Sequence, residues 1–157
     1  MNLEATYDLD APADYVFRRI TDHADFEALL MGYGANIERL DDETSLNVGM
    51  KWAIDGSFRG KQRQVEVALT DLRENELVSY SSESKDVNAS VDMKLQALSP
   101  KQTRFSIDLM PKANTISARL ILQSAKLARK TLEKRINRRF ADFCQRLEDD
   151  YRDITRG

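Results

Sequence analysis

The sequence predicts an α+β fold in which a curved antiparallel sheet of six to seven strands wraps around one long C-terminal helix. Three observations lead to this prediction. Between residues 35 and 110, apolar residues alternate with polar ones in several short segments, which is the pattern of half-buried strands. From residue 115 onward, apolar residues recur at helical spacing. Two shorter helical segments separate the first strand from the rest of the sheet.

The first 34 residues predict one strand followed by two short helices. Residues 2–9 alternate between apolar and polar side chains, as a strand with one buried face does. Pro12 suits the first turn of a helix. Residues 22–25 contain the aspartates that can end this helix and cap the next. Gly32 and Gly34 are expected to end the second helix.

The rest of the chain predicts hairpin-spaced strands and then one continuous helix. Pro100 lies in a segment typical of a tight turn between two strands. After Pro111 the apolar stripe meets no further glycine or proline before Gly157, so we expect an unbroken helix of roughly 45–50 Å. Asn114 or Thr115 is its expected cap. Residues 1–157 are expected to form a single domain, with fraying past about residue 150.

A cavity is expected between the sheet and the long helix. Strand twist curls a sheet of this size, and the helix must bury its apolar stripe against the concave face. Two such surfaces rarely fill the space between them, and an apolar cavity with a few polar groups is typical of small-molecule sites. The expected lining residues are Trp52, Ile54, Phe58, Val67, Tyr80, Met93, Phe105 and Ile107 from the strands, and Leu120, Ser124, Leu127 and Thr131 from the helix.

Several segments resemble the START-like proteins, also called the SRPBCC or helix-grip superfamily, which include polyketide cyclases, aromatase-type proteins and the birch-pollen allergen. Residues 11–26 (APADYVFRRITDHADF) resemble the beginning of these proteins, and residues 47–52 (NVGMKW) and 70–80 (TDLRENELVSY) resemble their central hairpins. Residues 117–129 (SARLILQSAKLAR) are similar to the last helix of the branch named after a carbon monoxide dehydrogenase accessory subunit. One departure is Phe26, where these proteins often carry a tryptophan.

This resemblance covers nearly the whole chain, but its motifs are loose. It implies the helix-grip fold, with a curved antiparallel sheet closed around the C-terminal helix. It also implies an apolar ligand, because members of the superfamily bind lipids, sterols, polyketides, quinones or plant hormones. Some members are catalytic.

No residue pattern predicts a catalytic or metal centre. His23 is the only histidine, which excludes a histidine-rich metal site, and a surface or capping role is expected for it. Cys144 is the only cysteine, and a buried inert thiol is a simpler interpretation than a Cys144–His23 nucleophile pair. We therefore expect no catalytic residue, no metal and no cofactor. Trp52 and Tyr80 are expected to be core aromatic residues, each with one satisfied polar atom.

Residues 126–139 are strongly basic in a chain whose formal net charge is -2. They contain seven Lys and Arg residues and one acidic residue, Glu133. The preferred interpretation is the solvated back of an amphipathic helix, paired in part with the acidic strands or with the acidic residues 148–150. The alternative is peripheral contact with a membrane or another protein. Interleaved aromatic residues are missing, so a nucleic-acid partner is not expected.

The preferred functional hypothesis is a binding or carrier domain for an apolar small molecule such as a lipid, a quinone or a polyketide-like aromatic. The N-terminus lacks the features of a signal peptide, so a cytoplasmic location is expected. One alternative is an enzyme of polyketide cyclase or hydratase type, which a polar pair converging on the cavity would favour. The other is an accessory interaction protein, which a very small cavity would favour. The oligomeric state is left open.

Overall fold

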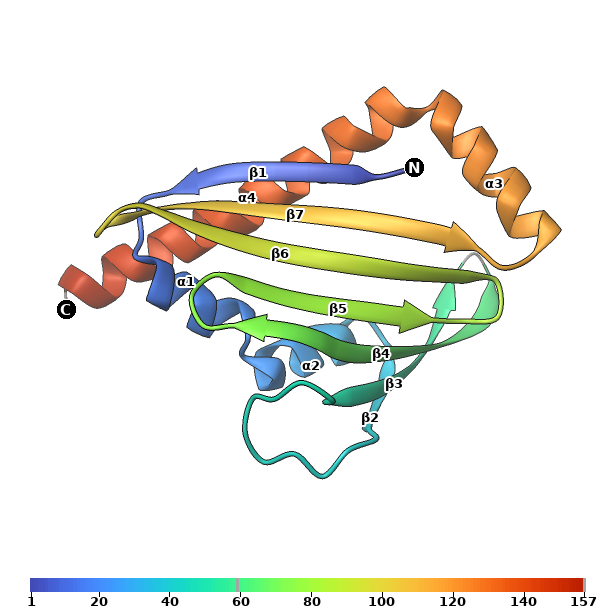
Figure 1. Ribbon diagram of the computed structural model, residues 1–157, viewed down its shortest axis with the longest axis horizontal. Coiled ribbons are helices and arrows are strands. Elements are labelled where there is room, and N and C mark those ends of the chain that lie inside the picture. The colour runs from blue at the N-terminus through green and yellow to red at the C-terminus, as the bar shows by residue number, and fades with distance from the viewer. Residues whose placement is uncertain (59, 157) are drawn as a thin grey trace.

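The computed structural model describes residues 1–58 and 60–156, which form one seven-stranded antiparallel sheet and four helices (Figure 1). The strands are β1 (Leu3–Leu9), β2 (Asn36–Arg39), β3 (Lys51–Phe58), β4 (Lys61–Arg73), β5 (Leu77–Glu83), β6 (Val87–Ser99) and β7 (Gln102–Ala113). The helices are α1 (Ala13–Ile20), α2 (His23–Gly32), α3 (Ile116–Leu127) and α4 (Arg129–Arg156). The strand order is β1-β7-β6-β5-β4-β3-β2, which confirms the predicted fold class.

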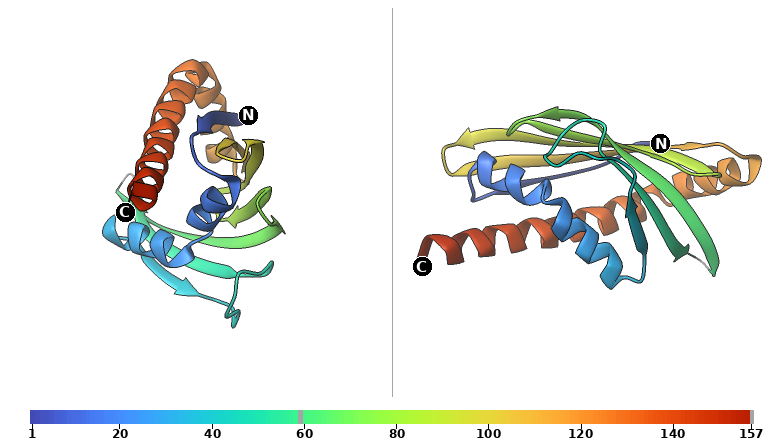
Figure 2. Two further views of the ribbon diagram at one scale, coloured as in Figure 1. Left: turned by 90° about the vertical axis from the view of Figure 1, so that its left-hand side faces the viewer. Right: turned by 90° about the horizontal axis from the view of Figure 1, so that it is seen from below.

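The sheet curls so that α1, α2 and α4 lie on its concave side (Figure 2). Its register places apolar residues together on this side, as where Val78 pairs with Met93 and Met93 pairs with Ile107. Alternation sends polar groups to the other side, where the Ser79 hydroxyl donates to Asp92 at 2.7 Å. The concave side therefore carries the apolar surface that the helices cover.

Two separate groups of buried residues stabilise the fold. The first lies where α1 and α4 pack on β1 and β7, and it consists of Ala5, Leu9, Ala11, Tyr15, Val16, Phe17, Leu95, Phe105, Phe140, Cys144 and Leu147. The second lies on β3, β4 and β5 and consists of Met50, Trp52, Leu69 and Val78. Apolar residues between the two groups, including Met93, Leu72 and Ile20, are only half-buried. The concave side is therefore packed at separate places rather than filled throughout.

The C-terminal helix is broken, which corrects the prediction of one unbroken helix. Its break is at Ala128, whose φ of -100° and ψ of 17° end α3, and α4 begins at Arg129 (Figure 1). The 28 residues of α4 span about 42 Å, close to the roughly 43 Å of a 13-residue strand. A straight continuation would project beyond the sheet, whereas the bend lets α3 pack against β7.

The helix caps follow local sequence signals. The Thr115 hydroxyl accepts a hydrogen bond from the backbone N–H of Ala118 at 3.1 Å, so Thr115 is the cap of α3. The Asp22 carboxylate accepts from the backbone N–H of Asp25 at 3.2 Å and starts α2. The α4 helix stays helical to Arg156, past the position where fraying was expected. No helix that the structure describes is both long enough and apolar enough to cross a membrane.

Candidate functional site

An open groove of about 470 Å³ lies between α1, α2, α4 and strands β6 and β7. Most of its surface is apolar, and charged groups stand at its rim. Its apolar lining residues are Ile20, Phe26, Leu29, Met93, Phe105, Ile107, Phe140, Phe143 and Leu147. Its charged lining residues are Arg19, Asp22, Asp25, Arg146 and Asp150. The volume and the composition both fall within the range of small-molecule sites.

Three apolar side chains of this groove are exposed to solvent. Phe26 and Leu29 on α2 are 41% and 53% exposed, and Phe143 on α4 is 37% exposed. Large apolar side chains gathered around a concave surface commonly mark a binding site. On the rim, the Arg19 guanidinium donates to the Asp150 carboxylate at 2.9 Å, which ties α1 to α4.

A second hollow of about 690 Å³ lies under α3, between this helix, the start of β4, the turn between β5 and β6, and the start of β6. Its apolar residues are Val65, Val87, Ala118, Ile121 and Leu122. Its charged residues are Lys61, Arg63, Lys85 and Asp86, and Arg63 forms an ion pair with Asp86 at 2.8 Å. The concave side is therefore hollow both beside α2 and beneath α3.

A polar and aromatic cluster lies where α2 covers β3 and β5. His23 Nε2 and the Tyr80 hydroxyl oxygen are 2.9 Å apart and share a hydrogen bond. The ring of His23 meets the ring of Trp52 edge-on at a centroid distance of 4.8 Å. Since His23 is half-buried against both aromatic residues, the expected surface or capping role for it is wrong. The cap of α2 is Asp22, the residue before it.

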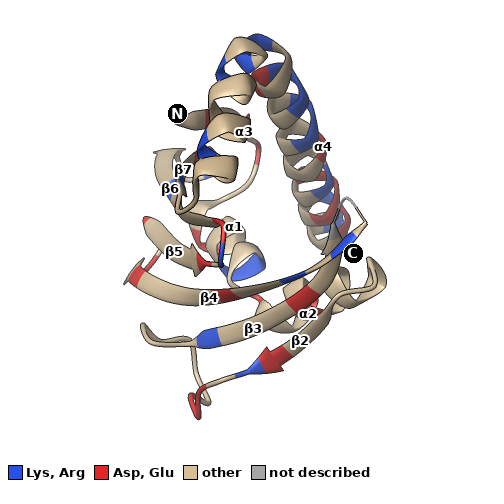
Figure 3. Cartoon of the chain, turned by 90° about the vertical axis from the view of Figure 1, so that its right-hand side faces the viewer, with Lys and Arg blue, Asp and Glu red and all other residues tan. Residues whose placement is uncertain are grey.

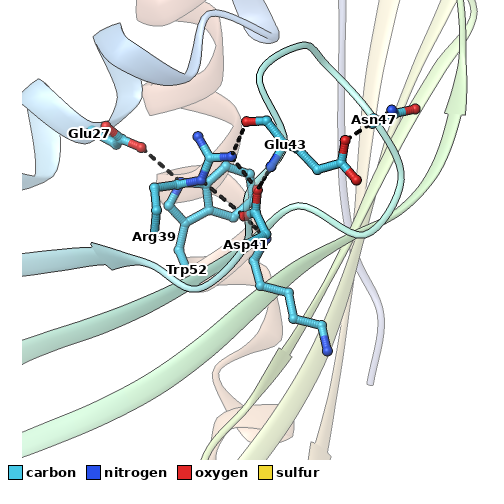
Figure 4. Close-up of polar contacts among 7 residues, drawn as sticks. Glu27, Arg39, Asp41, Glu43, Asn47 and Trp52 are labelled. Carbon is cyan, nitrogen blue, oxygen red and sulfur yellow. Dashed lines mark hydrogen bonds and ion pairs between the residues drawn. The ribbon is translucent and has the colours of Figure 1, made fainter.

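Trp52 contacts two charged residues, one at its indole N–H and one over its ring (Figure 4). Its indole N–H donates to the Glu27 carboxylate of α2 at 2.9 Å. The Arg39 guanidinium lies 5.4 Å from the centre of the indole ring and is itself bonded to Asp41. The backbone N–H of Lys51 also donates to Asp41, at 2.7 Å. These contacts join α2 to β2, β3 and the loop between them.

The surroundings of this cluster shift its acid–base behaviour. Burial, followed by the positive charge of Arg39, lowers the pKa of His23 below its ordinary 6.5. Burial raises the pKa of the Tyr80 phenol to about 12. The hydrogen bond from Arg39 holds the pKa of Asp41 well below its usual range. At neutral pH the pair is therefore an uncharged imidazole beside a protonated phenol, which can hold a polar group or pass a proton.

The twelve residues predicted to line the cavity separate into distinct groups. Met93, Phe105 and Ile107 line the groove. Trp52 lies in the second buried group, and Ile54, Val67 and Tyr80 pack against it. The side chain of Phe58 lies outside the described residues. The four predicted helix residues, Leu120, Ser124, Leu127 and Thr131, are all exposed to solvent.

The exposure of these four residues corrects the predicted orientation of the helix. Leu120 is 59% exposed and Leu127 is 92% exposed. The bend at Ala128 turns α3 so that Ala118, Ile121 and Leu122 face the hollow instead. The prediction placed all four residues on the cavity-facing flank of one straight helix. The bend accounts for the three on α3, whereas Thr131 lies on the exposed side of the first turn of α4.

Several groove residues were absent from the predicted lining. Phe140, Phe143 and Leu147 belong to the apolar stripe of α4, and Phe26 and Leu29 are the apolar residues of α2. Helical spacing was therefore the signal that could have identified them. No such signal could identify the His23–Tyr80 contact, because 57 residues separate the two in sequence.

Cys144 is remote from this chemistry. It is fully buried in the first group of core residues, and burial raises the pKa of its thiol to about 12. A thiol with so high a pKa is a poor nucleophile at neutral pH. Within residues 1–58 and 60–156, no three His, Cys, Asp or Glu residues are grouped to hold a metal ion.

Solved structures share this architecture at low sequence identity. The Zhui aromatase/cyclase of Streptomyces sp. R1128 is 15% identical, with a TM-score of 0.64 over 93% of this chain and 94% of that chain. A Thermus thermophilus protein is 14% identical, with a TM-score of 0.63 over 94% and 97%. A START superfamily protein of Mycobacterium smegmatis is 16% identical, with a TM-score of 0.56 over 87% and 97%.

No family model and no curated protein matches the sequence. The structural matches nevertheless extend over most of each chain. Likeness at this level of identity concerns the fold. The chain therefore has the START-like, or helix-grip, fold.

Proposed function

We propose that this chain binds an apolar small molecule, such as a lipid, a quinone or a polyketide-like aromatic, in the groove between the sheet, α2 and α4. The observation that carries the proposal is the groove of about 470 Å³ with its apolar lining. Three exposed apolar side chains at its mouth, Phe26, Leu29 and Phe143, support the proposal. Covering them with an apolar ligand removes apolar surface from water, which lowers the free energy of the complex. We propose that the protein acts as a carrier in the cytoplasm.

The likeness to ligand-handling proteins supports the same proposal. One structural neighbour is an aromatase/cyclase, and another is a START superfamily protein. The apolar lining and the charged rim of the groove would contribute differently to binding in this proposal. The apolar lining would supply affinity through buried area, and the charged rim would orient any polar end of the ligand.

The test is binding of an environment-sensitive apolar fluorophore, together with native mass spectrometry of protein purified from its own host. We expect a fluorescence increase that co-purified ligand reverses. Ile107→Trp adds bulk at a half-buried groove position, and should weaken fluorophore binding about tenfold or more by occupying the site.

Leu98→Trp is the matched control, because Leu98 is an exposed residue of β6 that does not line the groove. Both variants should retain the circular dichroism spectrum of the parent chain. Equal binding by Ile107→Trp and Leu98→Trp, or no binding by any of the three proteins, would contradict the proposal.

A second candidate function is an enzyme of cyclase or hydratase type that uses the same groove. The specific observation in its favour is the His23–Tyr80 pair, because His23 directly follows Asp22, which lines the groove. Tyr80→Phe removes the phenolic O–H while it keeps the ring. If the protein alters its co-purified ligand chemically and Tyr80→Phe does not, the enzyme is favoured. Release of the ligand unaltered by both proteins favours the carrier.

A further inference from the structure

An apolar stripe on α3 faces away from the rest of the molecule. Ile116, Leu120 and Leu127 recur at helical spacing and are 77%, 59% and 92% exposed. The opposite side of the helix, which includes Ala118 and Leu122, faces the hollow beneath α3. A helix whose two sides are both apolar, one of them in water, indicates a partner that covers the outer side.

Basic residues surround this stripe on α3 and on the first turns of α4. Figure 3 shows Lys and Arg gathered around the bend between the two helices and along α4. Between residues 116 and 139 there are eight Lys and Arg residues, against Glu133 as the only acidic one. We call the surface formed by Ile116, Leu120 and Leu127 with Arg119, Lys126, Lys130, Lys134 and Arg138 the α3–α4 elbow.

The positive charge of the elbow is not neutralised within the part of the chain that the structure describes. In the stretch 126–139, Arg129 with Glu133 is the one ion pair that the described residues form. The acidic residues near the C-terminus pair elsewhere, Asp149 with Arg152 and Asp150 with Arg19. The predicted partial pairing of the basic stretch with residues 148–150 is therefore wrong.

The chemistry of the elbow selects among possible partners. A nucleic acid would use the cations but not three exposed aliphatic side chains, and aromatic residues for stacking are missing from the elbow. An anionic bilayer uses both, because aliphatic side chains enter the acyl boundary while Lys and Arg remain at the headgroups. Arg119 and Lys126 lie on the same helix as the stripe and can extend their stems along it.

We propose that the α3–α4 elbow docks this protein peripherally on an anionic lipid bilayer. In this arrangement the outer side of α3 enters the interface, and the hollow of about 690 Å³ beneath α3 lies next to the membrane. An apolar molecule could then pass between the bilayer and the concave side without crossing bulk water. Docking itself stands apart from the ligand-binding function proposed above, since it needs only the elbow.

The experiment is co-sedimentation of the full chain with vesicles of phosphatidylcholine mixed with phosphatidylglycerol, and with vesicles of phosphatidylcholine alone. We expect binding to the anionic vesicles that added salt weakens, and little binding to the neutral ones. Leu120→Ser with Leu127→Ser should lower the partition coefficient at least about tenfold. Lys134→Glu with Arg138→Glu should lower it at least as much.

Matched controls are Ile154→Ser, at an exposed apolar residue near the far end of α4, and Lys101→Glu, at an exposed residue in the β6–β7 turn. Both should bind vesicles as the parent chain does, and circular dichroism should show all variants folded. Docking is overturned if anionic vesicles bind no protein at low salt. It is also overturned if the leucine double variant binds equally well, which would indicate an acidic macromolecule recognised by charge alone.

Failure of docking and failure of ligand binding give different results. Fluorophore binding in the groove is measured without vesicles, and vesicle binding is measured without fluorophore. Loss of vesicle binding in the leucine double variant, with fluorophore binding retained, separates the elbow from the groove.

Discussion

At the scale of single residues, the surroundings of His23 set its acid–base behaviour. Its imidazole packs against Trp52 and Tyr80, and the positive charge of Arg39 acts on it. Burial and this positive charge both disfavour the protonated ring. The acidic neighbours Glu27, Asp22 and Asp41 oppose the shift but do not cancel it. His23 therefore stays neutral in the folded chain at a pH where it is already protonated in the unfolded chain.

The sign of the resulting pH dependence follows from proton linkage. As the pH falls below about 6.5, the unfolded chain takes up a proton at His23 and the folded chain does not, so the free energy of unfolding decreases. We expect urea denaturation to show lower stability at about pH 5.5 than at about pH 7.5, and a smaller loss for His23→Gln. Because His23 is the only histidine, proton NMR measures its pKa directly. A pKa at or above 6.5 would contradict the prediction.

Residue-level prediction succeeded where the signal was local and failed where it was not. Trp52 and Tyr80 were identified as aromatic residues with one satisfied polar atom, and Glu27 and His23 supply the partners. Helix α2 brings both partners over the sheet, and no periodicity in the sequence encodes that placement. The role of His23 was missed for this reason, although Asp22 just before it was one of the two aspartates, with Asp25, predicted as the cap.

At the scale of elements, the break between α3 and α4 shows packing overriding a continuous helical pattern. No glycine or proline marks Ala128, so intrinsic propensity alone favours an unbroken helix. The length of the sheet favours a break instead, because α4 alone already spans the sheet and a straight continuation would find nothing to pack against. The two parts then turn different sides inward, which is why Leu120 and Leu127 were assigned to the wrong side.

Helix α3 begins directly after Thr115, whose side chain caps it, so Thr115 should matter more than other threonines of this region. Thr115→Ala removes the acceptor for the Ala118 N–H and should lower the free energy of unfolding by about 1 kcal/mol. Thr131→Ala is the matched change at an exposed position inside α4, where alanine has the higher helix propensity. It should leave stability unchanged or slightly raised. Equal losses in urea denaturation of the two variants would contradict a capping role.

At the scale of the whole molecule, the two buried groups stabilise different parts of the fold. The first joins α1 and α4 to β1 and β7, and the second joins β3, β4 and β5. Strand alternation and helical spacing predicted both the sheet and the helix that covers it, because each reports which side of an element is buried. They led to the expectation of a cavity but not to its position or to its lining on the helices, since these depend on how far apart two curved surfaces settle.

A ligand in the groove would connect parts of the molecule that now touch little. The groove is lined both by α4 residues such as Phe140 and by β6 and β7 residues such as Met93, which packs against both buried groups. A bound apolar molecule should therefore slow amide hydrogen exchange in α4 and in the central strands together. Stability should rise by about 2.7 kcal/mol at a ligand concentration a hundred times Kd. Ile107→Trp, which fills the site, should show neither effect, and hydrogen exchange that slows in one part alone would place the ligand elsewhere.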